Sequence, residues 1–411
     1  MFYIYIFISL IFIFLSIKVT KKILNPIFIF VGTWLAIIVL YQFELSNWQY
    51  NLIDDSYITF IINIMAFTIS YLLVYIFKRK KIIQNNEKKD DKNVIVDFNF
   101  IKKMFIFWII IEIIETIYSG GIPIIWKLVG SSKTYASYGI PTVHGLMNSI
   151  SLIIMLLSYY LYLKENRKNK KLLLIIGTII LFDLMIITRQ VIVSALIELF
   201  VIYIFFNKKI PVYKLLIIVS FLVIGFGLIG NIRTGSDNFI YVSSFKNENI
   251  NKFLIGFYWV YMYFTMSIAN INNAIYLGIN QYGLYPIMKN YLPTVFSNII
   301  FENSNIIIPN YLVTKAFNVS GYFINFYLAF GNLGVLIISS IYGVLGGIIT
   351  NKNRNESSEK NLLYMSVYIQ IIILSFFENH LFYLPSGFQF FLIFLIFKYI
   401  DRNMIRRKKY A

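Results

Sequence analysis

The chain has no cysteine and only two histidines among its 411 residues. Without cysteine it has no disulfides, zinc–thiolate sites, iron–sulfur clusters or thiol nucleophiles. Two histidines are also too few for a His-rich metal cage. Charged residues make up only 14% of the chain. Any catalytic chemistry must therefore come from a small set of acids, bases and arginines.

Long apolar runs dominate what remains. Hydrophobic residues make up 58% of the chain, against about 45–50% in soluble domains, which argues against a water-soluble enzyme. A membrane-spanning helix needs about 20 mostly apolar residues. Eleven apolar runs bounded by charge are candidates, and they lie near 2–17, 24–42, 57–77, 104–119, 144–163, 172–187, 191–206, 215–232, 323–349, 362–377 and 388–400. We expect an all-α polytopic membrane protein with about 11 transmembrane helices, within a range of 10–12.

The formal net charge of +18 would suggest a nucleic-acid partner in a soluble protein. Here the positions of the basic residues explain it. With the N-terminus outside, alternation of the spans leaves eight of the 37 basic residues on the outer side: Lys127, Lys133, Arg189, Arg233, Lys246, Lys252, Lys289 and Lys315. The other 29 fall in cytoplasmic segments, as the positive-inside rule requires. We therefore predict a cytoplasmic C-terminus and no nucleic-acid partner.

One segment tests this alternation. Residues 253–269 are apolar enough to span, but counting them alone would place the basic C-terminus outside. We interpret them as an interfacial or re-entrant helix. A paired extra span near 284–301 would also restore the alternation, although Lys289 and Pro293 weaken that alternative.

The expected organisation is a single integral membrane domain over 1–411. Residues 78–103, with the runs KRKK and NNEKKDDKN, form a cytoplasmic linker. Residues 120–143 form a Gly-rich outer loop. Residues 233–322 form a large outer loop, on the periplasmic or extracellular side, that contains interfacial helices.

Two outer-side arginines are the strongest candidates for function. Arg189 lies between apolar runs of about 16 residues, each about 24 Å long as a helix and so shorter than the roughly 30 Å hydrocarbon core. It is therefore drawn toward the membrane edge, either to snorkel to the surface or to serve a site, with Asp183 or Glu198 as its partner. Arg233 ends a span between Gly230 and Gly235, and the alternative is an ordinary interface anchor. Two guanidinium groups suit a diphosphate, because they pair bidentately with phosphate oxygens.

Both histidines, His144 and His380, fall at outer span ends. Either could act as a base near neutral pH, although a polar interfacial tip is the alternative. Glu378 lies two residues before His380 and could orient it. Glu112 and Glu115 are three apart and so share a helix face.

Such carboxylates are costly in a span unless they find partners. Lys127 and Lys133 of the next loop are the candidates. Trp126, Tyr135 and Tyr138 in the same loop could stack on sugar rings, or they could belong to an aromatic belt.

Metal and nucleotide motifs are missing. The sequence contains no D-x-D, Walker, G-x-G-x-x-G, H-E-x-x-H or G-x-S-x-G motif, so a nucleotide site is unsupported. Asp54-Asp55 in the first outer loop could hold a divalent cation in a metal-dependent transferase, but a helix N-cap is the preferred interpretation. We expect no metal and no cofactor.

The chain resembles the oligosaccharide repeat-unit polymerases of the O-antigen polymerase (Wzy) family. The resemblance rests on about eleven spans with a large outer loop before the last three, together with Arg189, Arg233-Thr234-Gly235 and the stretches Gly121-Ile122-Pro123, Tyr135, Tyr138-Gly139-Ile140-Pro141 and His144-Gly145. It covers most of the chain and implies a GT-C-like fold.

The resemblance also implies an activity at the outer face of a bacterial plasma membrane. Such an enzyme moves a glycan from one undecaprenyl-diphosphate carrier onto the next lipid-linked repeat unit, without metal or nucleotide sugar, to make O-antigen or capsular-type polysaccharide. By that analogy Arg189 and Arg233 bind the donor diphosphate, and a histidine or an acid activates the acceptor. Expected partners are the two lipid-linked glycans, membrane lipid, a chain-length regulator and a flippase. Alternatives are an O-antigen ligase-like transferase and a lipid-linked oligosaccharide flippase.

Overall fold

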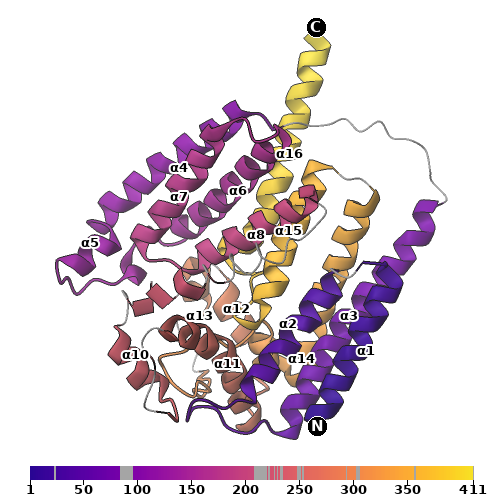
Figure 1. Cartoon of the computed structure of the whole chain (residues 1–411), viewed down its shortest axis with the longest axis vertical. Coiled ribbons are helices and arrows are strands. Elements are labelled where there is room, and N and C mark those ends of the chain that lie inside the picture. Colours follow the sequence, from indigo (N-terminus) through magenta and orange to yellow (C-terminus); the bar gives the residue numbers. More distant parts are fainter. Residues whose placement is uncertain are drawn as a thin grey trace. The chain divides into compact units, whose positions relative to one another are not determined.

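The computed structural model of the chain describes residues 1–411 except 23–24, 84–95, 208–219, 221–222, 226, 229, 232–234, 248–250, 252–253, 293, 302–305, 356–357 and 411. Its elements are helices (Figure 1), and the described residues add one isolated bridge between Ser46 and Phe245. The chain divides into two compact units built from alternating segments. Unit 1 contains 1–87, 219–351 and 371–380, and unit 2 contains 88–218, 352–370 and 381–411. The expected single membrane domain stays a prediction.

Unit 1 takes its helices from the first 87 residues and from two later segments of the chain. They are α1 (Phe2–Thr20), α2 (Pro26–Tyr41), α3 (Asp54–Ile83), α10 (Ser236–Ser243), α11 (Ile255–Tyr276), α12 (Tyr285–Tyr291), α13 (Thr294–Phe301), most of α14 (Ile324–Asn355) and the 3-10 turn η3 (Leu374–Phe376). The start of α2 follows from local chemistry, since the Asn25 side chain accepts a hydrogen bond from Phe28 N at 3.0 Å and Pro26 fills the first turn. Asp54 and Asp55 lie in the first turn of α3, where carboxylates favour the helix dipole.

Neutral amides make several of the polar contacts inside unit 1. Asn270 of α11 donates to the carbonyls of Phe317 and Val319 at 2.9 and 2.8 Å and accepts from Val313 N at 2.9 Å. On α3, Asn63 accepts from Tyr322 Oη at 2.6 Å. Amides satisfy both donors and acceptors without placing a charge in an apolar interior.

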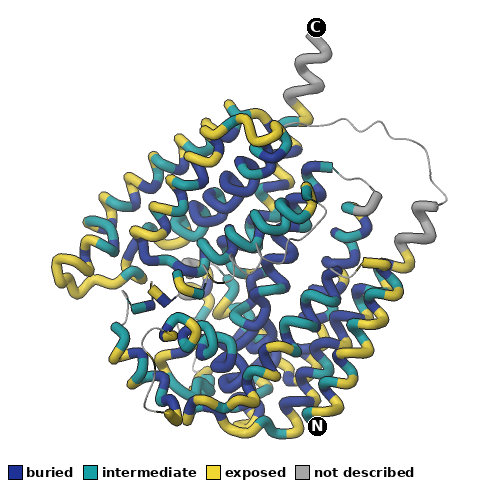
Figure 2. The backbone as a smooth tube through the Cα atoms, viewed as in Figure 1, coloured by how far each residue is buried: buried dark blue, intermediate teal, exposed yellow. Residues whose placement is uncertain are grey.

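Unit 2 is organised around one helix. Its elements are α4 (Phe98–Ser119), α5 (Pro123–Leu128), the 3-10 turn η1 (Tyr135–Ser137), α6 (Val143–Lys164), α7 (Lys170–Ile186), α8 (Gln190–Asn207), most of α15 (Glu359–Ile373) and α16 (Leu384–Tyr410). Helix α6 packs against α4, α7, α8 and α16, and 78% of its most apolar window is buried. The same window of α1 is only 17% buried, a contrast that Figure 2 displays residue by residue.

Seven described helices are long and apolar enough to cross a membrane: Phe2–Thr20, Asp54–Phe77, Phe98–Leu128, Val143–Lys164, Gln190–Asn207, Ile324–Asn353 and Leu384–Arg402. The chain is therefore an all-α, multi-pass membrane protein. The expected spans at 24–42, 172–187 and 362–377 coincide with the shorter helices α2, α7 and α15, whereas 215–232 lies largely outside the described residues. The total of about 11 spans stays a prediction.

The two expected outer loops contain helices. Residues 120–143 include α5 and η1, and 233–322 include α10 to α13. Segment 253–269 forms most of α11, which is not one of the seven spanning candidates. Its interfacial or re-entrant placement, and the cytoplasmic linker at 78–103, stay predictions.

Candidate functional site

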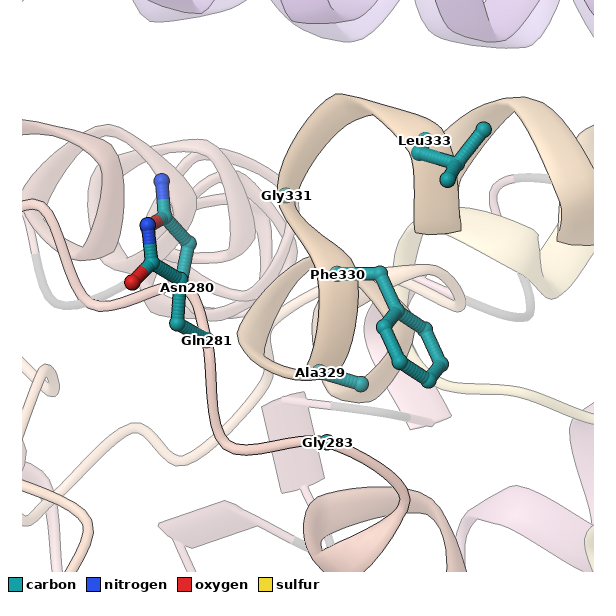
Figure 3. Close-up of a pocket in the computed structure, with 7 residues that line it drawn as sticks. All are labelled: Asn280, Gln281, Gly283, Ala329, Phe330, Gly331 and Leu333. Carbon is teal, nitrogen blue, oxygen red and sulfur yellow. The ribbon is translucent and has the colours of Figure 1, made fainter.

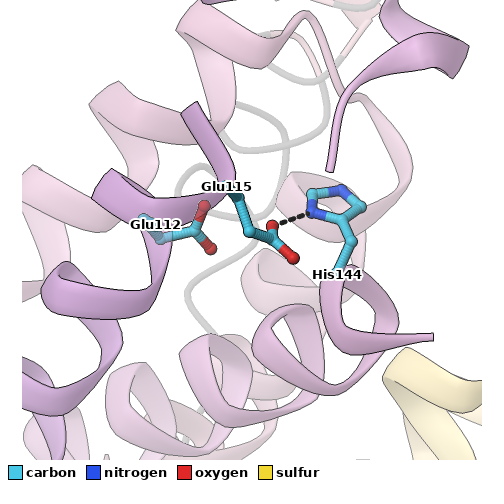
Figure 4. Close-up of side chains that lie close together, drawn as sticks. All are labelled: Glu112, Glu115 and His144. Carbon is cyan, nitrogen blue, oxygen red and sulfur yellow. Dashed lines mark hydrogen bonds and ion pairs between the residues drawn. The ribbon is translucent and has the colours of Figure 1, made fainter. Parts of the chain in front are cut away.

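Helix α4 places two carboxylates at one point of unit 2. Glu112 and Glu115 are 3% and 0% exposed, and both face the start of α6, where His144 is the second helical residue (Figure 4). The shared face predicted from their spacing is therefore found. Their partners differ from the expected lysines. His144 and Tyr138 contact them instead.

Glu115 orients the imidazole of His144. Its Oε2 lies 2.8 Å from Nδ1 of His144, and its Oε1 accepts from the backbone N–H of Ile140 at 3.3 Å. The carboxylate is buried, whereas the histidine side chain is 22% exposed. A carboxylate on Nδ1 fixes the tautomer and leaves Nε2 as the basic nitrogen. The arrangement is that of a general base with its orienting acid.

Tyr138 covers the second carboxylate. Its hydroxyl lies 2.9 Å from Thr116 Oγ1 and donates to Glu112 Oε2 at 3.4 Å, while its ring meets the His144 ring edge-on at 5.4 Å. Burial raises the pKa of Tyr138 above its usual value, so the hydroxyl stays protonated and remains a donor.

The backbone before α6 is closely fitted to the histidine. Gly139 has a φ of +90°, and a Cβ built there would lie 2.6 Å from the Cβ of His144. Thr142 has a φ of +70°, which is rare for a β-branched residue. Ser119 Oγ accepts from Gly139 N at 2.8 Å. Such strain persists only where the surroundings impose it, and it is common at functional sites.

The lysines of the 120–143 loop have other contacts. Lys133 donates to the carbonyl of Ser119 at 2.8 Å, at the C-terminal end of α4, and its Nζ lies 5.3 Å from the ring centre of Trp126. Lys127 is exposed and Tyr135, which begins η1, is half-buried. Lys133 therefore supports the loop that carries Tyr138 and does not contact the carboxylates directly.

Arg189 belongs to the same end of unit 2. It lies just before α8, its carbonyl accepts from Val193 N at 3.0 Å, and it is 8% exposed. Three residues earlier, Ile186 packs in one hydrophobic cluster with Trp126 and Tyr138. The junction of α7 and α8 is thereby anchored beside the loop that precedes His144. Arg233 lies outside the described residues.

The other histidine has a different setting. His380 belongs to unit 1, is 0% exposed, and has Nε2 4.0 Å from Oε1 of Glu378. Burial lowers the pKa of His380 to about 3. It is therefore neutral near pH 7 and enclosed by protein.

Sequence reasoning did not foresee the polar contacts deeper in unit 2. Gln389 of α16 donates to Glu198 Oε1 at 2.9 Å, and Gln370 of α15 donates to Ser194 Oγ at 3.0 Å. The sequence held one indication of these contacts. Ser194 and Glu198 are four residues apart and so share a face of α8, and α15 and α16 each contain a single glutamine.

Three ligand atoms also meet at the candidate site. Glu112, Glu115 and His144 offer two carboxylate oxygens and one imidazole nitrogen within 4.8 Å of one another. Oxygen and imidazole ligands in this number suit a divalent transition metal. The site thus has two chemical uses, as a base with its orienting acid or as a cation site.

Comparison of the chain with protein-family models, with curated proteins and with solved structures gives no match.

Proposed function

We propose that the chain is a membrane glycosyltransferase that polymerises undecaprenyl-diphosphate-linked oligosaccharide repeat units. Its product is an O-antigen or capsular-type polysaccharide, made on the outer face of a bacterial plasma membrane. The observation that carries the proposal is the contact of 2.8 Å between buried Glu115 and half-buried His144. It supplies a positioned base where an acceptor hydroxyl can reach it.

The transfer needs one proton acceptor and one charge-stabilising group. His144 Nε2 takes the proton of the acceptor hydroxyl as its oxygen bonds to the anomeric carbon of the donor sugar. The bond between that carbon and the diphosphate oxygen breaks, and its electron pair goes to the diphosphate. Glu115 stabilises the imidazolium that forms. No cofactor is needed for this balance.

Arginine is the group best suited to the leaving diphosphate. Its guanidinium stays charged and binds phosphate oxygens bidentately. Fixed charges near the membrane edge act strongly because water is scarce there. We assign this role to Arg189, because Ile186, three residues earlier, packs against Trp126 and Tyr138 of the loop before His144. We assign it also to Arg233, from its place in the sequence.

The structure of the lipid carrier explains why the site would lie at the ends of membrane helices. A polyprenyl chain lies in the bilayer and its diphosphate at the surface, so a site at the ends of membrane helices meets both. The proposed orientation has the N-terminus outside and the C-terminus cytoplasmic. A flippase would deliver the repeat units, and a chain-length regulator would set the size of the product.

The experiment uses a strain that lacks the gene and carries it on a plasmid. We expect His144→Gln, Glu115→Gln, Arg189→Ala and Arg233→Ala each to insert normally but to lower polymer at least about a hundredfold, the range for removing a catalytic base or a charge-stabilising group. Lipid-linked single repeat units should accumulate. Lys315→Ala removes an exposed cation that is predicted to lie on the outer side, and it is the matched control.

The product distinguishes the proposal from its closest rival. Loss of a ligase would leave long chains on the carrier instead of single units. If His144→Gln and Arg189→Ala both gave a normal ladder of chain lengths, the proposed base and diphosphate contact would be wrong.

A metal-dependent transferase is the second candidate, and the meeting of Glu112, Glu115 and His144 within 4.8 Å favours it. Chelation separates the two. The metal-independent polymerase keeps its activity in purified membranes treated with a chelator, whereas a metal enzyme loses it and regains it with one added divalent cation.

A further inference from the structure

Helix α14 is interrupted close to its start. Phe330 and Gly331 have non-helical backbone angles, and Gly331 has φ +60° and ψ −142°, a combination that only glycine adopts readily. Non-helical backbone within a membrane helix is tolerated where it is buried in protein or lines a polar cavity. Broken helices of this kind commonly form ligand sites.

A second segment of unit 1 is fastened to this break. The backbone N–H groups of Gln281 and Tyr282 both donate to the carbonyl of Leu328, at 3.0 and 3.1 Å. On the far side of the break, Asn332 Oδ1 accepts from Thr59 Oγ1 at 2.8 Å. Both halves of α14 are therefore held in place, and the break is a built feature of the fold.

A pocket of about 460 Å³ lies between the break and the fastened segment. Figure 3 shows seven lining residues: Asn280, Gln281, Gly283, Ala329, Phe330, Gly331 and Leu333. Its volume falls in the usual range for small-ligand sites, about 300–1,000 Å³, and the pocket is largely open to its surroundings. These residues supply two amide side chains, one aromatic ring and two glycines, which leave the backbone accessible to a ligand. Each of the seven residues is uncharged.

We propose that this pocket binds a neutral sugar of the glycan. An amide donates and accepts at once, as paired sugar hydroxyls require. The ring of Phe330, which is 41% exposed, offers an apolar face for sugar C–H groups. An anionic ligand would find no Lys or Arg among the described residues that line the pocket. An acyl chain would offer no hydrogen bond to the exposed amide of Gln281 or to that of Asn280, whose Nδ2 donates to Tyr327 Oη at 3.5 Å.

The pocket lies at the end of α14 opposite Lys352, so the positive-inside rule assigns it to the outer side. The inference rests on the proposed function for the source of the sugar, while the neutral polyhydroxyl class follows from the lining itself. The pocket would hold part of a repeat unit while the lipid diphosphate is bound elsewhere.

The test measures binding, separately from turnover. Saturation-transfer NMR on detergent-purified protein would use a panel of neutral hexoses, N-acetylhexosamines and their disaccharides, with pyrophosphate as the anionic comparison. We expect at least one neutral sugar to bind, and the double substitution Asn280→Ala, Gln281→Ala to weaken it about tenfold. Phe330→Ala should also weaken it, through loss of the ring face.

The control is Asn238→Ala, which removes an exposed amide of unit 1 outside the pocket and should leave binding unchanged. His144→Gln should retain sugar binding even where polymer is lost, so failure of the proposed function and failure of the pocket give different results. The proposal is overturned if no neutral sugar of the panel binds, if only pyrophosphate binds, or if the double variant binds like wild type.

Discussion

At the scale of single residues, the fit between Gly139 and His144 decides the geometry of the candidate base. Gly139 has a positive φ, and a methyl group added to it would approach the His144 side chain to 2.6 Å, which leaves no room for a larger residue. The histidine reaches Glu115 because the chain before it turns tightly. Gly139 thus positions the imidazole of His144, although glycine itself has no reactive side chain.

We therefore expect Gly139→Ala to lower the stability of the protein by about 1–3 kcal/mol and to reduce polymer strongly. Gly177→Ala is the control, because a Cβ there meets nothing within 4 Å inside α7, and alanine favours a helix over glycine by about 0.5–1 kcal/mol. Thermal unfolding in detergent and chain-length ladders measure the two effects. A Gly139→Ala variant with wild-type stability and product would contradict the close fit.

The buried histidine His380 leads to a second prediction at this scale, which concerns the pH dependence of stability. Its pKa in the folded protein is lowered to about 3 by burial, against about 6.5 in an unfolded chain. Between these values the unfolded chain binds a proton that the folded one does not. Above pH 6.5 His380 is neutral in both states and does not oppose folding. As the pH falls from 6.5 toward 3, the free energy of unfolding decreases by about 1.4 kcal/mol per pH unit.

The measurement is unfolding of wild type and His380→Gln in detergent between pH 8 and pH 4. The variant should lose less stability on acidification than wild type, whatever its stability at pH 8. Parallel pH curves would mean that His380 is not held neutral by the fold, and that the nearby carboxylate of Glu378, at 4.0 Å, supports its charged form.

At the scale of elements, α11 is the segment whose position has the largest consequence. It is a 22-residue helix, yet its C-terminal half carries Asn270, Asn272 and Asn273, which bind loop carbonyls or hydroxyls. Those amides explain why its apolar first half is not followed by a membrane-length run. An interfacial or re-entrant helix leaves the orientation of later spans unchanged.

Reporter fusions test this orientation. We expect a fusion at Asn86, outside the described residues, to report the cytoplasm, and one at Gln281 to report the outer side. The basis is the distribution of Lys and Arg along the sequence. A cytoplasmic signal at Gln281 would mean that α11 crosses the membrane and that every later span is inverted.

The elements also mark how far sequence reasoning reaches. Apolar run lengths predicted most helices, and the spacing of Glu112 and Glu115 predicted their common face. The pairing with His144 was beyond reach, because it depends on how α4 and α6 pack and on the turn at Gly139. No sequence feature predicted the break in α14, because Gly331 lies in a mostly apolar run that contains several other glycines.

At the scale of the whole molecule, charge and polarity are used sparingly. The basic excess serves the predicted orientation, and interior contacts rely on neutral groups such as Asn63, Asn270 and Gln389. Among the described residues, the buried acids and bases are a few Asp and Glu side chains, His380 and Arg189. These exceptions stand out against the neutral background, and they supply most of the candidate site.

The alternation of the two units along the chain has a consequence for biosynthesis. Unit 1 begins with the first 87 residues but receives its last segment at 371–380, and unit 2 is completed only by 381–411. Helices that are inserted early therefore lack some of their packing partners until the later segments are synthesised. A nascent chain that stalls before residue 371 leaves both units unfinished, with interior faces open to lipid and to the proteases that survey the membrane.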